Sequence, residues 1–148
     1  NISSCPHQPG GPCTAGQYCP AGSPMWQACP GGSYCADGSG IVTGPCNEGY
    51  YCTQGAKVPS PQNAVDEYGN VLGDVCPAGY YCPLGSVSPS ACPSGTFSGS
   101  TGNTNSSACL LCLPGFICPD ASTTNCTEPC PAGFYCPAGE ARSATNCC

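Results

Sequence analysis

Basic side chains are almost absent from this chain, which has only Lys57 and Arg142 among its 148 residues. Eight acidic residues leave a net charge of -6 at pH 7. Nucleic-acid binding depends on many Lys and Arg contacts to phosphates, and attraction to anionic membranes depends on the same side chains. The sequence therefore predicts no nucleic-acid partner and no electrostatic binding to membranes.

Large apolar residues are also scarce, because Leu, Ile, Val and Phe together number only 17. No apolar run approaches the roughly 18 residues of a transmembrane helix, so we expect no direct membrane insertion in this segment. No signal peptide is recognisable either, so we expect a processed chain or a fragment. Without covalent links, the burial of so few large apolar residues could not offset the entropy cost of folding.

Catalytic side chains are missing as well. His7 is the only histidine, and no Ser-His-Asp or Cys-His arrangement can be assembled around it. Asp66 and Glu67 form the only adjacent acid pair, without the regularly spaced oxygen ligands of a calcium loop. The β-prone residues on both sides of Gly69-Asn70 favour a solvated hairpin there. The sequence predicts no enzyme, no cofactor and no metal.

Cysteine, glycine and proline are abundant instead, with 18, 21 and 18 residues. A cysteine fraction above roughly 8–10% is typical of disulfide scaffolds in oxidising compartments. We therefore expect an extracellular or secreted protein, at a cell surface or on an appendage. The pair Cys109 and Cys112 lacks the second pair of a zinc or redox site, which favours disulfides there too. The cysteines expected in disulfides are Cys5, Cys13, Cys19, Cys29, Cys35, Cys46, Cys52, Cys76, Cys82, Cys92, Cys109, Cys112, Cys118, Cys126, Cys130, Cys136, Cys147 and Cys148.

One short motif, Cys-x-x-Gly-x-aromatic-Cys, recurs along the chain. Intact copies begin at Cys13, Cys29, Cys46, Cys76 and Cys130. Two degenerate copies begin at Cys92, where Ser98 replaces the second cysteine, and at Cys112, where the aromatic is shifted by one position. We divide the chain into repeats in residues 1–52, an insertion at 53–75 and repeats in residues 76–148, which we expect to continue into a further repeat.

Each motif position has a physical reason. Proline and glycine suit a tight turn, glycine because it adopts φ > 0 at little cost. The aromatic ring is nearly the only large apolar group of its unit, and we expect it to pack on disulfides and prolines of the next unit. These expected packing residues are Tyr18, Tyr34, Tyr51, Tyr81, Phe97 and Tyr135. The predicted fold is small and disulfide-rich: an elongated rod of loop-rich repeats with short two-stranded β-ribbons and essentially no helix.

Disulfide connectivity is limited by the spacing but not determined. The simplest periodic solution joins the second cysteine of one motif to the first of the next. This ladder would contain Cys5–Cys13, Cys19–Cys29, Cys35–Cys46, Cys52–Cys76 and Cys82–Cys92, and Cys92–Cys109 competes with its last bridge.

Glycosylation sites follow the Asn-x-Ser/Thr pattern at Asn1, Asn105 and Asn125. Attached glycans would help to dissolve a chain in which only 7% of the residues are charged. We expect such glycans on surface loops, with Asn105 the best candidate because Ser, Thr, Gly and Asn surround it.

The motif Cys-Pro-Ala-Gly-Tyr-Tyr-Cys resembles the ephrin-receptor-like cysteine-rich repeat of surface proteins in ciliates and other protists. The segment from Cys92 to Cys112 also resembles the opening of a tumour-necrosis-factor-receptor module. Such repeats serve in receptors, adhesins, coats and filaments. We expect a structural component of an extracellular filament, appendage or coat whose chains associate head to tail with copies of themselves. The alternative is a ligand-binding or adhesive ectodomain that uses the 53–75 insertion, with Trp26 and Met25 as an exposed anchor.

Overall fold

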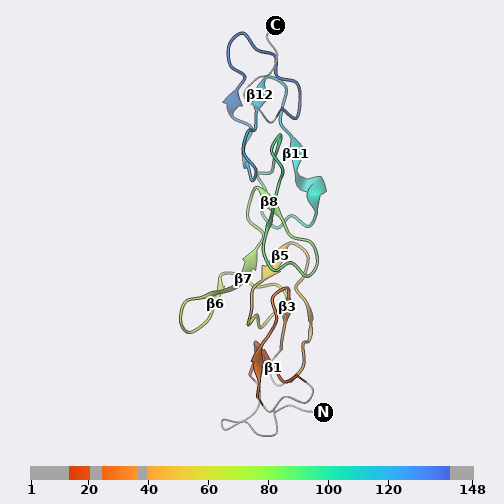
Figure 1. The fold of residues 1–148 in the computed structure, drawn as a ribbon, viewed down its shortest axis with the longest axis vertical. Coiled ribbons are helices and arrows are strands. Elements are labelled where there is room, and N and C mark those ends of the chain that lie inside the picture. The colour runs from red at the N-terminus through yellow and green to blue at the C-terminus, as the bar shows by residue number, and fades with distance from the viewer. Residues whose placement is uncertain (1–13, 21–24, 37–39, 141–148) are drawn as a thin grey trace. The chain divides into compact units, whose positions relative to one another are not determined.

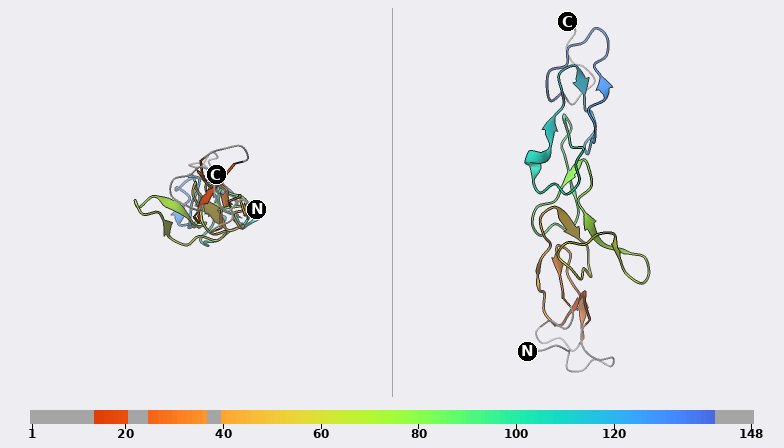
Figure 2. Two further views of the ribbon diagram at one scale, coloured as in Figure 1. Left: turned by 90° about the horizontal axis from the view of Figure 1, so that it is seen from below. Right: turned by 180° about the vertical axis from the view of Figure 1, so that it is seen from behind.

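The computed structural model describes residues 14–20, 25–36 and 40–140. The chain divides into two compact units, Asn1–Val75 with Cys82–Ser88 and Cys76–Tyr81 with Pro89–Cys148. The described residues contain short antiparallel strands, one 3₁₀ turn and no α-helix (Figures 1 and 2). The predicted class, a disulfide-rich fold of repeated two-stranded ribbons, is confirmed. No helix of the described stretches is long and apolar enough to span a membrane.

Several residues that carried expectations lie outside the described part of the chain. They are Asn1, Cys5, His7, Cys13, Arg142, Cys147 and Cys148.

A tight turn inside each motif is the smallest repeated element. In the second motif, Ser33 N–H donates to the Pro30 carbonyl at 3.2 Å, and Gly32 occupies the third turn position with φ 81°. A turn of this type requires φ > 0 at that position, which explains the fixed glycine. The glycines of all seven motifs have φ between 81° and 87°. They are Gly16, Gly32, Gly49, Gly79, Gly95, Gly115 and Gly133.

Short ribbons follow the first six of the seven motif turns, because the residues after the motif glycine pair with the residues just before the first cysteine of the next motif. In the first unit the pairs are β1 (Gln17–Tyr18) with β2 (Gln27–Ala28), β3 (Ser33–Tyr34) with β4 (Gly44–Pro45), and β5 (Tyr50–Cys52) with β7 (Val71–Val75). Strand β7 also pairs with β6 (Ala64–Val65), which gives a three-stranded sheet of order β5-β7-β6.

The second unit repeats the same pairing. Its ribbons are β8 (Tyr80–Tyr81) with β9 (Ser90–Ala91), β10 (Thr96–Phe97) with β11 (Leu110–Leu111), and β12 (Phe116–Ile117) with β13 (Glu128–Pro129). A 3₁₀ turn, η1 (Ser106–Ala108), precedes β11, and the Asn105 side chain caps it by accepting from Ser107 N–H at 3.0 Å.

Backbone hydrogen bonds connect successive motifs in one recurring pattern. Gly32 N–H donates to the Cys52 carbonyl at 2.7 Å, and the Gly32 carbonyl accepts from Cys46 N–H at 2.8 Å. The same two bonds join Gly16 with Cys35 and Cys29, Gly79 with Ser98 and Cys92, Gly95 with Cys118 and Cys112, and Gly115 with Cys136 and Cys130. The motif glycine is therefore both the turn residue and the contact point with the next motif.

The motif glycines also allow a close approach of backbone from further along the chain. A Cβ atom on Gly32 would lie 2.5 Å from the Gly85 carbonyl oxygen, and one on Gly79 would collide with the Ser122 carbonyl. Gly85 follows a motif with φ 78°, and Ser122 occupies the corresponding place after a later motif with φ 61°. Positive φ at this second position persists even where serine replaces glycine, because the backbone packing demands it.

The core consists mainly of sulfur. Cys46, Cys52 and Ala56 form a buried cluster, with Tyr34 and Tyr50 packed against it. Among the described Leu, Ile and Val residues, the buried ones are Leu72 and Ile117, and Pro61 is fully buried as well. Disulfides thus occupy the space that aliphatic side chains fill in ordinary domains.

The disulfides close within motifs, so the predicted ladder is wrong. The bonds of this kind are Cys29–Cys35, Cys46–Cys52, Cys112–Cys118 and Cys130–Cys136. The motif turn reverses the chain and brings the Cα atoms of Cys29 and Cys35 to 5.8 Å, well within disulfide range. The ladder bridges Cys19–Cys29, Cys35–Cys46, Cys52–Cys76 and Cys82–Cys92 are excluded, because one cysteine of each has another partner. Cys19, Cys76 and Cys82 are also disulfide-bonded, and the ladder bridge Cys5–Cys13 lies outside the described residues.

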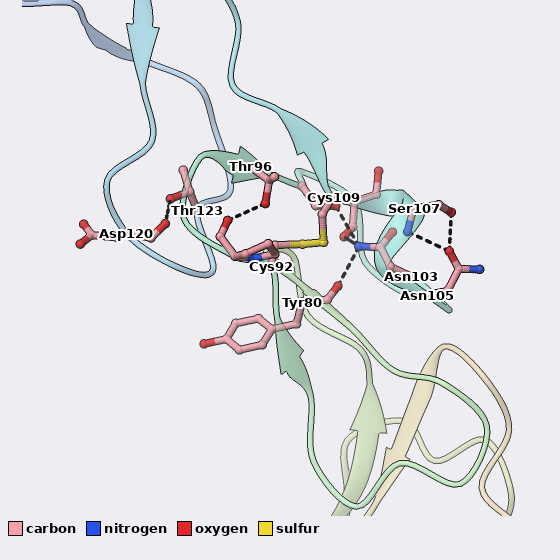
Figure 3. Close-up of a disulfide and its surroundings, with 12 residues drawn as sticks. Tyr80, Cys92, Thr96, Asn103, Asn105, Ser107, Cys109, Asp120 and Thr123 are labelled. Atoms are coloured by element: carbon pink, nitrogen blue, oxygen red, sulfur yellow. Dashed lines mark hydrogen bonds between the residues drawn. A yellow bond between two sulfur atoms is a disulfide. The ribbon is translucent and has the colours of Figure 1, made fainter. Parts of the chain in front are cut away.

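The motif that begins at Cys92 has no second cysteine. A disulfide to a later cysteine and a group of side-chain hydrogen bonds replace the internal bridge (Figure 3). Cys92 bonds to Cys109, the alternative that the spacing had left open. Ser98, only 3% exposed, accepts a hydrogen bond from the Asn103 side-chain amide at 2.9 Å. The same amide nitrogen also donates to the carbonyls of Tyr80 and Ser100. A polar network therefore takes over the position of the missing bridge.

Candidate functional site

An open groove of about 800 Å³ lies in the first unit, beside the loop that joins β6 to β7. This loop extends away from β3 and β5 (Figure 1). The groove is lined by the aromatic residues Trp26 and Tyr68, by amide side chains that include Gln17 and Gln54, and by Lys57. Both features of the predicted binding alternative, Trp26 and the 53–75 insertion, therefore border one groove.

The loop at the groove has a defined conformation because a carboxylate organises it. One Asp66 oxygen accepts from the backbone N–H groups of Tyr68 and Asn70, each at 2.8 Å, and the other accepts from the Asn70 side chain at 2.8 Å. The bond from the Asn70 side chain, helped by the backbone bonds, lowers the pKa of Asp66 from its ordinary value of 3.8. Asp66 is thus a structural acceptor in the hairpin, with Gly69 in its turn at φ 86°.

Aromatic side chains at the groove remain accessible. Trp26 is 41% exposed and Tyr68 is 82% exposed, and Met25 beside Trp26 is exposed as well. Lys57 is the one basic side chain of the described residues, and it shares the groove with Asp66 and Glu67. The groove therefore combines flat apolar faces with amides and charges of both signs, which suits a polar ligand that also has apolar faces.

The aromatic residues expected to pack between successive repeats differ in their surroundings. Tyr34 packs against the cluster that contains Cys46 and Cys52 of the following motif. Tyr135 is 61% exposed, and Phe134 beside it is exposed too. The half-buried members of the set are Tyr18, Tyr34, Tyr51, Tyr81 and Phe97.

The predicted glycan acceptors Asn105 and Asn125 are both exposed, and Asn1 lies outside the described residues. The Asn105 side-chain oxygen caps η1, and its amide nitrogen, the atom that would carry a glycan, donates to the Thr104 hydroxyl at 3.3 Å. Glycosylation at these positions stays a prediction.

Cys126 differs from the expectation that every cysteine is bridged, because the structure gives it a free, half-buried thiol. Its sulfur lies close to those of Cys112 and Cys118. Sequence reasoning missed this arrangement because Cys126 belongs to no motif. The only signal was that it stands as an extra cysteine between two motifs.

No protein-family model matches the chain. A stretch of 48 residues, 32% of the chain, is 50% identical to part of the cysteine repeat modular protein A of Toxoplasma gondii. The match spans about 1% of that protein's length. Together with the disulfides and the periodic hydrogen bonds, this similarity shows a cysteine-rich repeat. The number of disulfides fits an extracellular or secreted protein.

Proposed function

We propose that this chain is a non-catalytic structural component of an extracellular coat, appendage or filament. In this proposal its ephrin-receptor-like repeats carry glycans and associate head to tail with copies of the same chain. The recurring bonds between motif glycines and the next motif support it, since they show that one backbone surface can accept the next repeat many times over. A contact that repeats without closing on itself propagates into a filament.

Exposed aliphatic side chains are the observation that carries this proposal. Leu110, Leu111 and Leu113 are 57%, 62% and 52% exposed within four consecutive positions. Ile41 and Leu84 are exposed to similar extents. A chain with so few aliphatic residues that leaves these at its surface has apolar area available for contact with another copy.

The test is the mass and appearance of the secreted, non-reduced chain by light scattering and electron microscopy. We expect concentration-dependent assemblies, and we expect the triple variant Leu110→Ser, Leu111→Ser, Leu113→Ser to be monomeric. A matched control replaces Val65 and Val71, exposed valines of the hairpin, with serine and should still assemble. A wild-type chain that stays monomeric at all concentrations would contradict the proposal.

A second candidate, a binding module for carbohydrate, is favoured by the groove. Aromatic faces such as that of Trp26 stack on the C–H faces of sugar rings, while amides and carboxylates bind the hydroxyl groups. Because Trp26 is the only tryptophan, its fluorescence reports directly on the groove. Binding on a glycan array that changes this fluorescence and is lost in Tyr68→Ala would support this candidate, and an array without binding would contradict it.

A further inference from the structure

Three cysteine sulfurs meet in the second unit. Cys112 and Cys118 form a disulfide, and the Cys126 sulfur lies 2.9 Å from the Cys112 sulfur. All three sulfur atoms lie within 4.8 Å of one another. Within the ranges that the structure describes, no other group of three cysteines is gathered so closely.

Backbone contacts hold the three sulfurs in this arrangement. Leu113 N–H donates to the Cys126 sulfur at 3.2 Å, so the residue next to Cys112 positions the free thiol. Cys112 is itself fixed on both sides, because its N–H donates to the Gly95 carbonyl at 2.9 Å and its carbonyl accepts from Gly139 N–H at 2.8 Å. These backbone hydrogen bonds therefore hold the Cys126 thiol beside the Cys112 sulfur.

We propose that this cluster is a thiol–disulfide exchange site. The Cys126 thiolate attacks the Cys112 sulfur, the Cys112–Cys126 bond forms, and the Cys112–Cys118 bond breaks. Cys118 leaves as a thiolate and takes up the proton that Cys126 gave to solvent. One disulfide and one thiol are present before and after the step, so no external oxidant or reductant is needed.

The exchange changes where the free thiol is found. Cys126 is half-buried and can be reached from solvent, whereas Cys118 is 0% exposed. With the Cys112–Cys118 bond the chain presents a reactive thiol, and with the Cys112–Cys126 bond it hides one. The site thus selects between an accessible form and a protected form. In the accessible form the Cys126 thiolate can attack the disulfide of another compound, which forms a mixed disulfide and releases one half of that compound as a thiolate.

Metal binding is the other use of three neighbouring sulfurs, but the disulfide argues against it here. Thiolates bind metals, and two of the three sulfurs are joined to each other. A thiolate site would first need a reductant, whereas exchange uses the groups as they stand.

The decisive experiment maps the disulfides of the oxidised full chain by mass spectrometry. The protein is equilibrated at mildly alkaline pH, quenched with acid and alkylated in denaturant. Cleavage after Phe116 and before Asp120 separates Cys112, Cys118 and Cys126 onto different peptides. We expect two populations in the wild-type chain, Cys112–Cys118 with alkylated Cys126, and Cys112–Cys126 with alkylated Cys118. A single pairing, or a Cys126 bonded to a cysteine outside this trio, overturns the proposal.

Single-cysteine variants add a matched comparison. In Cys118→Ser we expect Cys126 to bond with Cys112, so that neither is alkylated. In the control Cys52→Ser, Cys46 loses a partner at the same spacing of six residues, and we expect it to be alkylated because it has no third sulfur nearby. Alkylation of both Cys112 and Cys126 in Cys118→Ser would overturn the proposal. If the variants fail to fold, the wild-type map alone decides.

Discussion

The intact motif that begins at Cys46 and the degenerate motif that begins at Cys92 have nearly the same backbone. Their glycines, Gly49 and Gly95, have φ 82° and 85° and donate to carbonyls of the next motif at 2.8 Å in both cases. Only the first motif has an internal disulfide, because Ser98 replaces the second cysteine in the other. The glycine turn and its hydrogen bonds to the next motif, which we call the backbone frame, therefore determine the repeat geometry. The internal disulfide stabilises this frame but is not needed to form it.

The comparison also shows what a missing bridge requires. Ser98 is buried, so its hydroxyl needs a partner, which the Asn103 amide supplies. Cys92 would otherwise be a buried thiol, and it bonds to Cys109 seventeen residues later. In the degenerate motif, the Ser98–Asn103 hydrogen bond and the Cys92–Cys109 disulfide thus satisfy the two positions that an internal disulfide joins in the intact motif.

The largest expected effect comes from a motif glycine. Gly32→Ala should lower the free energy of unfolding by about 3 kcal/mol or more, since the new Cβ would combine φ > 0 with a collision at the Gly85 carbonyl. Gly115→Ala is the control, because Gly115 has φ 84° but no atom within 4 Å of the added Cβ. It should cost about 1–2 kcal/mol. Urea unfolding of the non-reduced chain, followed by circular dichroism, measures the free energy of unfolding of both variants. Equal losses in the two variants would contradict a role for the close backbone contact at Gly32.

Removal of an internal disulfide should have the next largest effect. The double variant Cys46→Ser, Cys52→Ser should lose about 2–3 kcal/mol by the chain-entropy estimate for so short a loop. It should still fold, because the Cys92 motif folds without an internal bridge. A double variant that is unfolded under native conditions would show that the disulfide, and not the backbone frame, makes the repeat.

The polar network of the degenerate motif should contribute somewhat less to the free energy of unfolding than an internal disulfide does. Asn103→Ala leaves buried groups around Ser98 without their donor and should cost about 1–3 kcal/mol. Asn47→Ala removes an exposed amide bond to Ser60 and should change the stability by less than about 0.5 kcal/mol. Thermal unfolding of the two variants gives the comparison, and similar shifts would mean that Asn103 does not substitute for the bridge.

The smallest effect should come from protonation of Asp66 in the hairpin between β6 and β7, because this hairpin makes none of the hydrogen bonds that connect successive motifs in the described part of the chain. The pKa of Asp66 is lowered, so its hydrogen bonds contribute fully above the ordinary value of 3.8 and are lost as the pH falls through the lower folded value. The amide NMR signals of Tyr68 and Asn70 should shift in that acidic range, while the Gly32 signal stays constant. Signals of Tyr68 and Asn70 that titrate above 3.8 would contradict the assigned hydrogen bonds.

Much of the fold could be predicted from the sequence because the motif is local. The cysteine spacing and the fixed glycine indicated turns and short ribbons, and both occur. The pairing was wrong because a periodic chain allows a bridge within a motif as readily as one between motifs. Only the turn geometry at residues such as Pro30 and Gly32 decides between them. The position of Ser122 at φ 61° had no recognisable signal, since a packing demand from Gly79 fixes it.

The candidate site was predictable only in part. Trp26 and the insertion stood out in the sequence, but their common groove depends on contacts between residues far apart in the chain. The proximity of Cys126 to Cys112 depends on the same kind of long-range contact. Spacing alone does not encode such contacts.

The most direct test of the central claim is amide hydrogen exchange in the Cys46→Ser, Cys52→Ser variant. The hydrogen bonds that define the frame are those of Gly32 N–H with the carbonyl of residue 52 and of residue 46 N–H with the Gly32 carbonyl. We expect both amides to remain protected, to a degree similar to Gly79 N–H and Cys92 N–H, which form the equivalent bonds with the naturally bridge-free motif. Loss of protection at the amides of residues 32 and 46, while Gly79 N–H stays protected, would contradict the claim that the glycine turn and its hydrogen bonds determine the repeat geometry.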